Sequence, residues 1–262
     1  MKITVNGIEM NYEMQGEGKN LVLIHGYSDN LNMWYNQVPE FSKQFQVLSY
    51  DVRGFGKSEI GKGPYSMELC ADDLYALLKA LNMESACLLG YSMGGRIGLS
   101  FTLKHPDMVR GLVFANSGVG GETTPEVEEA RKMMLEVLKQ GDIETIAEMM
   151  AVASFSPDFK ERDPEIFRKY KEIKMQNDPS PYVSIMEALF AAIENPPDLS
   201  QVKCPALIIA GENDGFMPLD VAQSMKNAIR HAVLKVLPTG HAAAIEAPEE
   251  FNAIVMEFLK GL

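Results

Sequence analysis

The sequence has few cysteines and no long apolar run. Three of its 262 residues are cysteine, and Cys70, Cys87 and Cys204 are far apart in the chain. An odd number of widely spaced cysteines provides neither a disulfide framework nor the spacing of metal ligands. We therefore expect these cysteines to be small buried apolar side chains of a protein in a reducing compartment. No apolar run approaches the roughly 20 residues that span a bilayer.

Positive charge is also scarce. Lys and Arg number 24 against 36 Asp and Glu, which gives a formal net charge of −12. Nucleic acids and anionic membrane surfaces repel such a chain, so we expect neither as a partner. The opening residues, "KITVNGIEMNY", lack a charged segment followed by an apolar one and do not resemble a signal peptide. We therefore expect a cytoplasmic protein, either a monomer or a homodimer.

Short apolar runs separated by helical patterns are what the sequence does contain. Such runs are typical of strands buried on both faces of a parallel sheet, and they occupy residues 20–26, 45–51, 86–91, 109–117, 206–214 and 232–238. Asn6-Gly7 predicts a hairpin turn near the start, and helices are expected at 66–81, after Ser92 and from Pro248. The pattern predicts an α/β fold with a mostly parallel twisted sheet and helices on both faces.

One segment, residues 119–197, interrupts this alternation. It has no convincing strand, and its periodicity predicts helices at 125–139, 142–153, 163–177 and 180–195. We predict a helical cap inserted into a core domain made of residues 1–118 and 198–262. Six of the cap's methionines are expected mainly in its own core, with a few facing a substrate; they are Met133, Met134, Met149, Met150, Met175 and Met186.

A single serine carries the strongest chemical signal. Ser92 lies in "LLGYSMGGRIG", within a Gly-x-Ser-x-Gly frame that follows a predicted strand and opens a predicted helix. Small residues at such a turn let strand and helix approach closely, which holds a serine in the strained conformation of a nucleophile elbow. Because serine is a weak nucleophile alone, the chain must also supply a base.

The candidate bases are the four histidines. Catalytic groups in open α/β sheets gather beyond the carboxyl ends of the strands, which favours His25 and His241 over His105 and His231. His25 precedes the serine and has a competing role in shaping the turn after its strand. His241 follows the last strand in "PTGHAAAIEAPEEF", and we predict that it is the base.

The third member must be an acid that orients the histidine. Asp214 directly follows the penultimate strand in "AGENDGFMP", and its competitors are Glu212 and Asp220. Glu212 is closer to the strand end than Asp214, and Asp220 is expected on the next helix. Asp214 is therefore preferred. The order of Ser92, Asp214 and His241 along the chain is the one found in α/β-hydrolases.

Five blocks of the sequence resemble the recurring blocks of the α/β-hydrolase family: "LIHGYSDNLNMW", "SYDVRGFGKS", "LLGYSMGGRIG", "IAGENDGFMP" and "TGHAAAIEAPEEF". The resemblance covers nearly the whole chain apart from the cap. Within the family, the chain is most similar to small capped carboxylesterases and enol-lactonases, which use no cofactor.

The resemblance implies that the backbone N–H groups of Tyr27 and Met93 form an oxyanion hole. Met93 is also suited to this on physical grounds, because the unpaired amides at a helix start favour negative charge. Outside the site, we expect Asp51 and Arg53 in "DVRGFGKS" to pair and shape a loop.

These residues predict a serine hydrolase whose partner is a small-molecule ester or lactone. One alternative is a lyase like that of the menaquinone pathway, in which Arg96 of "SMGGR" would bind a substrate carboxylate; otherwise Arg96 braces its helix. Carbon–carbon bond hydrolases and perhydrolases share the triad and stay open. A non-enzymatic member of the fold would lack one of the three residues, and none is missing here.

Overall fold

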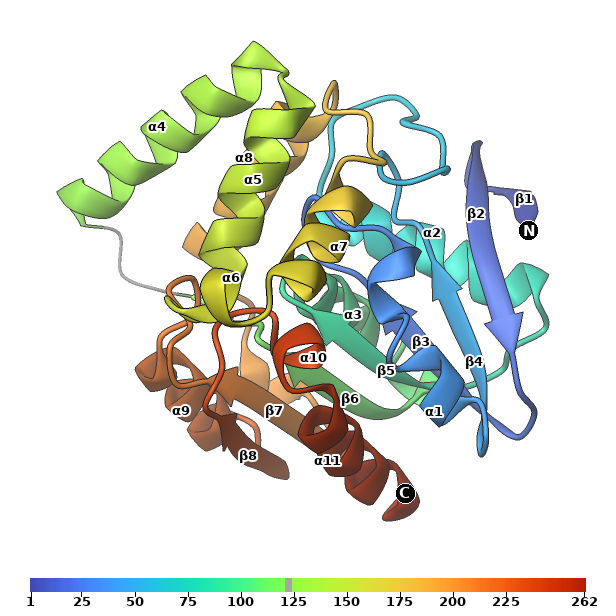
Figure 1. Cartoon of the computed structure of the whole chain (residues 1–262). Coiled ribbons are helices and arrows are strands. Elements are labelled where there is room, and N and C mark those ends of the chain that lie inside the picture. The colour runs from blue at the N-terminus through green and yellow to red at the C-terminus, as the bar shows by residue number, and fades with distance from the viewer. Residues whose placement is uncertain (121–123) are drawn as a thin grey trace.

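The computed structural model describes residues 1–120 and 124–262, and in them an eight-stranded sheet forms the centre of the molecule (Figure 1). Its strand order is β1-β2-β4-β3-β5-β6-β7-β8. The strands are β1 (Lys2–Val5), β2 (Ile8–Gln15), β3 (Lys19–Ile24), β4 (Phe45–Tyr50), β5 (Ala86–Tyr91), β6 (Val109–Ala115), β7 (Ala206–Gly211) and β8 (Ala232–Leu237).

The first two strands pair antiparallel, as do β2 and β4, and all later pairs are parallel. The predicted hairpin joins β1 to β2, with Asn6 and Gly7 both at positive φ as that turn requires. From β3 to β7 the strands are almost entirely buried, as their continuous apolar runs predicted. Every strand predicted from an apolar run is present, most ending a few residues earlier than expected.

Helices cover both faces of the sheet and so complete the predicted architecture. One apolar layer joins the sheet to α2 (Met67–Ala80), α3 (Met93–Lys104) and α9 (Leu219–Ala228). The opposite layer joins it to α1 (Val38–Phe41), α10 (Ala243–Glu246) and α11 (Pro248–Lys260). The Ser66 side chain accepts the N–H of Leu69 and so caps the start of α2.

Between β6 and β7, all regular structure in the described residues is helical. These elements are α4 (Pro125–Gln140), α5 (Ile143–Ser154), α6 (Phe159–Arg162), α7 (Pro164–Lys174), α8 (Tyr182–Glu194) and the 3-10 helix Leu199–Gln201. Helices α4–α8, which we call the cap helices, lie together in the upper left of Figure 1, whereas the 3-10 helix contacts α9. Residues 121–123 of the predicted insertion lie outside the described residues.

Two details correct the sequence-based expectations. Arg53 does not pair with Asp51 but with Asp73 of α2, through a buried bidentate contact with both distances at 2.6 Å. Asp51 instead accepts the backbone N–H groups of Leu31 and Lys57. Helix α6 was missed, because Pro157 and Asp163 indicated a break in the chain, although Phe159 between them is buried.

Within the described residues, no helix is both long and apolar enough to cross a membrane.

Candidate active site

Ser92 occupies a sharp turn between β5 and α3. Its φ of 51° and ψ of −116° lie outside the regions that non-glycine residues normally adopt. The Ser92 N–H donates to the carbonyl of Ala115 at 3.0 Å, and its own carbonyl accepts the Ser117 hydroxyl at 2.6 Å. The end of β6 and the segment directly after it therefore hold this strained residue through both its N–H and its carbonyl.

Glycines make the turn possible. A Cβ on Gly94 would overlap the carbonyl oxygen of Ile24, at the end of β3, and a Cβ on Gly90 would overlap the backbone of Gly94. Helix α3 therefore starts so close to the strands that no side chain fits at either position. The small residues of "GYSMGG" meet the steric requirement expected of the motif.

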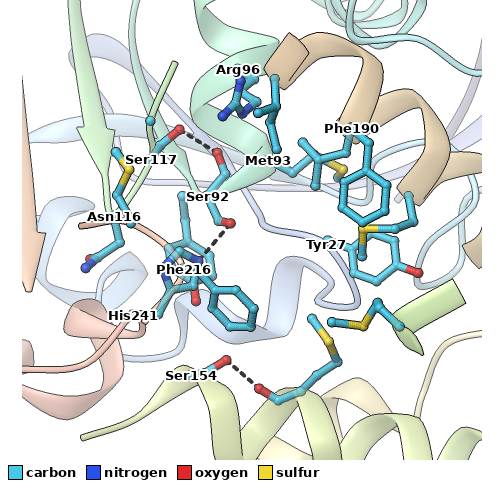
Figure 2. A pocket seen from close by; sticks show the side chains of 18 of the residues that line it. Tyr27, Ser92, Met93, Arg96, Asn116, Ser117, Ser154, Phe190, Phe216 and His241 are labelled. Carbon is cyan, nitrogen blue, oxygen red and sulfur yellow. Dashed lines mark hydrogen bonds between the residues drawn. The ribbon is translucent and has the colours of Figure 1, made fainter. Parts of the chain in front are cut away.

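The structure brings Ser92, His241 and Asp214 together from three different loops, and Figure 2 shows Ser92 directed toward His241. The Ser92 Oγ lies 2.8 Å from Nε2 of His241. On the other side of the imidazole ring, Nδ1 lies 2.8 and 2.9 Å from the two carboxylate oxygens of Asp214. Both the histidine and the aspartate are buried. Proton transfer from the hydroxyl to the ring is geometrically direct.

The Asp214 carboxylate is fixed by three further donors. The N–H groups of Phe216 and Met217 reach Oδ1 at 2.9 and 3.0 Å, and the Asn116 side chain reaches Oδ2 at 3.1 Å. Phe216 also packs against the His241 ring, with the ring centres 5.0 Å apart. The carboxylate therefore presents one fixed edge to Nδ1. The competing acids Glu212 and Asp220 are exposed, and Asp220 binds the N–H of Val221.

The other histidines lie outside this group. His25 is buried in the turn after β3, where its Nε2 accepts the Val52 N–H and its Nδ1–H donates to the carbonyl of Gly26, both at 2.8 Å. Burial lowers its pKa from the ordinary value, consistent with a neutral ring whose two nitrogens are occupied. His105 stacks on Tyr75, and His231 is exposed.

Tyr27 and Met93 border the same cavity as Ser92. Met93 is the first residue of α3, where backbone N–H groups have no partner within the helix. In the described part of the chain, neither the Tyr27 N–H nor the Met93 N–H meets an acceptor. Both amides are therefore free to bind an oxygen of a substrate.

The cavity above Ser92 has a volume of about 150 Å³ and is mainly apolar. Cap helices supply much of its wall through Met134, Met150, Met186, Leu189, Phe190 and Ile193, and the core adds Phe216 and Met217. Figure 2 shows Phe190 and Tyr27 across the cavity from His241. Met134, Met150 and Met186 line the cavity, as expected of a few of the six cap methionines, and Met150 and Met186 are also buried in the apolar core. Met133 and Met175 are exposed, so the expectation of an internal role was wrong for these two.

Arg96 borders the cavity one helical turn after Ser92. Its Nη1 donates to the Ala192 carbonyl at 3.4 Å, and no carboxylate in the described part of the chain lies within ion-pair distance of it. Burial, together with the charge of Arg131, lowers the pKa of Arg96 to about 10. Arg96 is thus a half-buried cation that makes a single long hydrogen bond within the described residues.

Several residues of the site were not expected from the sequence. Asn116 and Ser117 directly follow β6, just as the predicted site residues follow the ends of their own strands. This position after a strand could have identified them from the sequence. Lys174 also lines the cavity. It could not be predicted, because the surrounding sequence "KEIKMQN" is typical of a solvent-exposed helix. Across residues 1–120 and 124–262, no group of three or more His, Cys, Asp or Glu side chains could hold a metal ion.

The chain is similar to known hydrolases over nearly its whole length. The family model described as the alpha/beta hydrolase fold matches residues 19–248. The chain is 30% identical to 3-oxoadipate enol-lactonase 2 of Acinetobacter baylyi, over 98% of this chain and 96% of that protein. It is also 30% identical to a 2-hydroxy-6-oxononadienedioate/2-hydroxy-6-oxononatrienedioate hydrolase of Paraburkholderia phymatum, covering 96% of this chain and 91% of that one.

Among solved structures, the chain resembles the enol-lactonase from Burkholderia xenovorans LB400. The TM-score is 0.91 with 30% identity, covering 99% of this chain and 100% of the other.

Proposed function

Since this chain belongs to the alpha/beta-hydrolase family, we propose that it is a serine hydrolase that cleaves carboxylic esters or lactones through an acyl-enzyme. The observation that carries the proposal is the hydrogen-bonded series from Ser92 through His241 to Asp214, opening into an apolar cavity. That series activates a hydroxyl, and the cavity suits a neutral acyl group.

In the first half of the reaction, Ser92 Oγ attacks the substrate carbonyl while its proton passes to His241 Nε2. Asp214 accepts the Nδ1–H, which keeps Nε2 unprotonated and ready to receive that proton, and then stabilises the resulting imidazolium. The tetrahedral intermediate places negative charge on the former carbonyl oxygen. We assign the Tyr27 and Met93 N–H groups to this oxygen, because donors prearranged for a developing charge lower the barrier.

The acyl-enzyme forms when the ester C–O bond breaks and His241 gives its proton to the departing alkoxide oxygen. In a lactone that oxygen stays attached to the acyl group. A water molecule then attacks the acyl carbon, His241 accepts its proton, and Ser92 leaves as a hydroxyl after receiving the proton back. The product is a carboxylic acid with a free alcohol or, from a lactone, a hydroxy acid.

A substrate series tests the proposal. Initial rates are measured on p-nitrophenyl esters of graded acyl length, on simple lactones and on acyl-homoserine lactones. We expect turnover of short acyl chains, because the cavity is small. Mass spectrometry of the quenched reaction should show the acyl group on the peptide that contains Ser92. Hydrolysis without any adduct on that peptide, or no hydrolysis of the whole series, would contradict the proposal.

Arg96 favours a second candidate, in which the substrate carries a carboxylate. Leaving a substrate carboxylate unpaired in a dry cavity is costly, and Arg96 lies where it could pair with one. This would suit carbon–carbon bond hydrolysis or the menaquinone-type lyase. The cap arginines are paired elsewhere: Arg131 lies near Arg96 but pairs with Glu194, while Arg162 pairs with Asp163 and Arg168 with Glu172. The ester or lactone assignment therefore has the better support.

A further inference from the structure

A buried ion pair joins the cap to the turn that follows β3. Lys174, the last residue of α7, places its Nζ 2.7 Å from Oδ1 of Asp29, and both side chains are only 1% exposed. The same Nζ donates to the Ser28 hydroxyl at 3.2 Å and lies 4.3 Å from the centre of the Tyr170 ring. Burial lowers the pKa of Lys174, and Asp29 opposes that shift.

Stability alone does not account for this pair. Moving two charges out of water is expensive, and apolar side chains of similar volume often serve stability equally well. A buried ion pair with directional hydrogen bonds does, however, fix the relative position of the two segments that carry it. Its location therefore matters more than its strength.

The turn is tied to the cap at four further points. Each is a hydrogen bond between residues 27–30 and the segment 170–182: Tyr170 Oη to Asp29 Oδ2 at 3.3 Å, Asn177 Nδ2 to the Ser28 carbonyl at 2.9 Å, Asn30 Nδ2 to the Ile173 carbonyl at 2.8 Å, and Tyr27 Oη to the Tyr182 carbonyl at 2.9 Å. Side chains and carbonyls of one cap segment thus hold every residue of this turn.

The turn also needs such support. Ser28 has a φ of 62°, a conformation that costs a non-glycine residue roughly 1–2 kcal/mol. Within the turn itself, the Asp29 N–H reaches the Gly26 carbonyl at a long 3.3 Å. The Gly26 carbonyl and the Tyr27 N–H belong to the same planar peptide unit. The contact of the Asp29 N–H with that carbonyl, made while Ser28 keeps this conformation, therefore helps to set the direction of the Tyr27 N–H.

We propose that Lys174 is a positioning residue: by holding Asp29 and Ser28, it keeps the Tyr27 N–H where the oxyanion forms. This inference rests on the proposed function, which assigns that N–H to the oxyanion. Helix α7 then affects catalysis, because the oxyanion site is complete only while α7 is packed against the turn. The cap then contributes to the rate of the reaction as well as to the choice of substrate.

The test removes both charges together, in the double variant Lys174→Met/Asp29→Asn. A single Lys174→Met variant would leave Asp29 buried and unpaired, which endangers folding. We expect kcat for a short p-nitrophenyl ester to fall about tenfold to a hundredfold, since an oxyanion donor acts mainly on the transition state. KM should change less than about threefold, because ground-state binding is spared.

A matched control removes the other buried ion pair. Arg53→Met/Asp73→Asn eliminates the pair between Arg53 and Asp73, which within the described residues has no hydrogen bond to residues 26–30 or to the cap helices. This control should lower the melting temperature yet leave kcat within about twofold, as expected for a distant and independent site. A similar loss of kcat in both double variants would show a general effect of destabilisation and overturn the proposal.

Amide hydrogen exchange separates this proposal from the proposed function. In a Ser92→Ala background, exchange in the peptide covering residues 26–30 should be at least about tenfold faster in the Lys174→Met/Asp29→Asn variant, with β5 unchanged. If the wild-type protein hydrolyses no ester or lactone, the proposed function fails while this measurement still reports on the turn. Unchanged exchange in residues 26–30 would overturn the positioning role.

The kinetic split decides between positioning and substrate contact. A raised KM with unchanged kcat would show that Lys174 binds the substrate and would contradict the proposal, as would wild-type values of both. Should the double variant fail to fold, Asp29→Asn alone replaces it, because an amide oxygen can still accept from Lys174. A several-fold lower kcat is then expected at constant KM, and a wild-type kcat would contradict the proposal.

Discussion

The core and the cap contribute to the site in different ways. Ser92, Asp214 and His241 all come from loops at the ends of core strands, and close backbone contacts hold the serine turn in place. The cap contributes long apolar side chains, above all Met134, Met186 and Phe190. Rigid backbone geometry suits the groups to which we assign the reaction, because reacting groups must be placed within fractions of an ångström. Flexible thioethers and aliphatic chains suit an adaptable substrate surface.

This contrast has one exception, and the exception is informative. Lys174 belongs to the cap, but it is buried and forms an ion pair with Asp29, which is also buried. Helix α4, by comparison, has most of its surface in solvent, and Met133 on it is 64% exposed. The cap thus has two parts. Helix α7 packs firmly against the turn after β3, whereas α4 has few buried side chains.

Ser92→Ala should produce the largest change, because it removes the attacking atom itself. We expect ester hydrolysis to fall by a factor on the order of 10⁶ in kcat, with the melting temperature unchanged or higher. Steady-state rates and a thermal melt measure both. A variant that keeps more than about one per cent of wild-type turnover would be far outside this range and would remove Ser92 from its assigned role.

Asp214→Asn should follow, with a loss on the order of 10⁴ in kcat, because an amide at this position favours the wrong histidine tautomer. The exposed neighbour Glu212 provides the control, and Glu212→Gln should leave kcat within about twofold, as surface substitutions usually do. A damaging Glu212→Gln beside a mild Asp214→Asn would mean that the acid is assigned to the wrong residue.

A pair of glycine substitutions compares backbone tolerance in the two regions. Gly94→Ala should lower the free energy of unfolding by at least about 3 kcal/mol, since its Cβ would overlap the Ile24 carbonyl. Gly141 follows the last residue of cap helix α4 with a φ of 70°, and a Cβ there would meet open space. Gly141→Ala should therefore cost only about 1 kcal/mol, the strain of a side chain in the left-handed conformation. Urea unfolding measures both, and equal losses would contradict the contrast between a tight core turn and a tolerant cap.

Arg96→Ala should have the smallest effect on a neutral short-chain ester. We expect less than a tenfold loss, or about 1.4 kcal/mol in the barrier, because the guanidinium makes one long hydrogen bond to the cap. The measurement compares kcat/KM of the variant and of the wild type on a neutral ester and on a monoester of a dicarboxylic acid, which carries one negative charge. A loss of several hundredfold on the neutral ester, with the fold intact, would place Arg96 in the reaction and favour the carboxylate-binding candidate.

Much of the core could be predicted from the sequence, because its information is local. Continuous apolar runs specify buried strands, the glycines around Ser92 specify a close approach of strand and helix, and Asn6-Gly7 specifies a hairpin. Parallel strands end at one edge of the sheet, so the order of Ser92, Asp214 and His241 already indicated which side chains should meet. The helical nature of residues 125–195 was readable for the same reason, apart from α6.

Tertiary structure alone decided which charged groups pair and which surfaces face the substrate. Arg53 selects Asp73, 20 residues away, over Asp51, two residues away, because side-chain partners depend on how helices seat on the sheet. Lys174 and Asp29 lie 145 residues apart, and each stands in a stretch that is typical of exposed chain. The cap's methionines were interchangeable in sequence, yet three line the cavity. Helical periodicity identifies an apolar face, but the packing of the cap on the core determines what that face contacts.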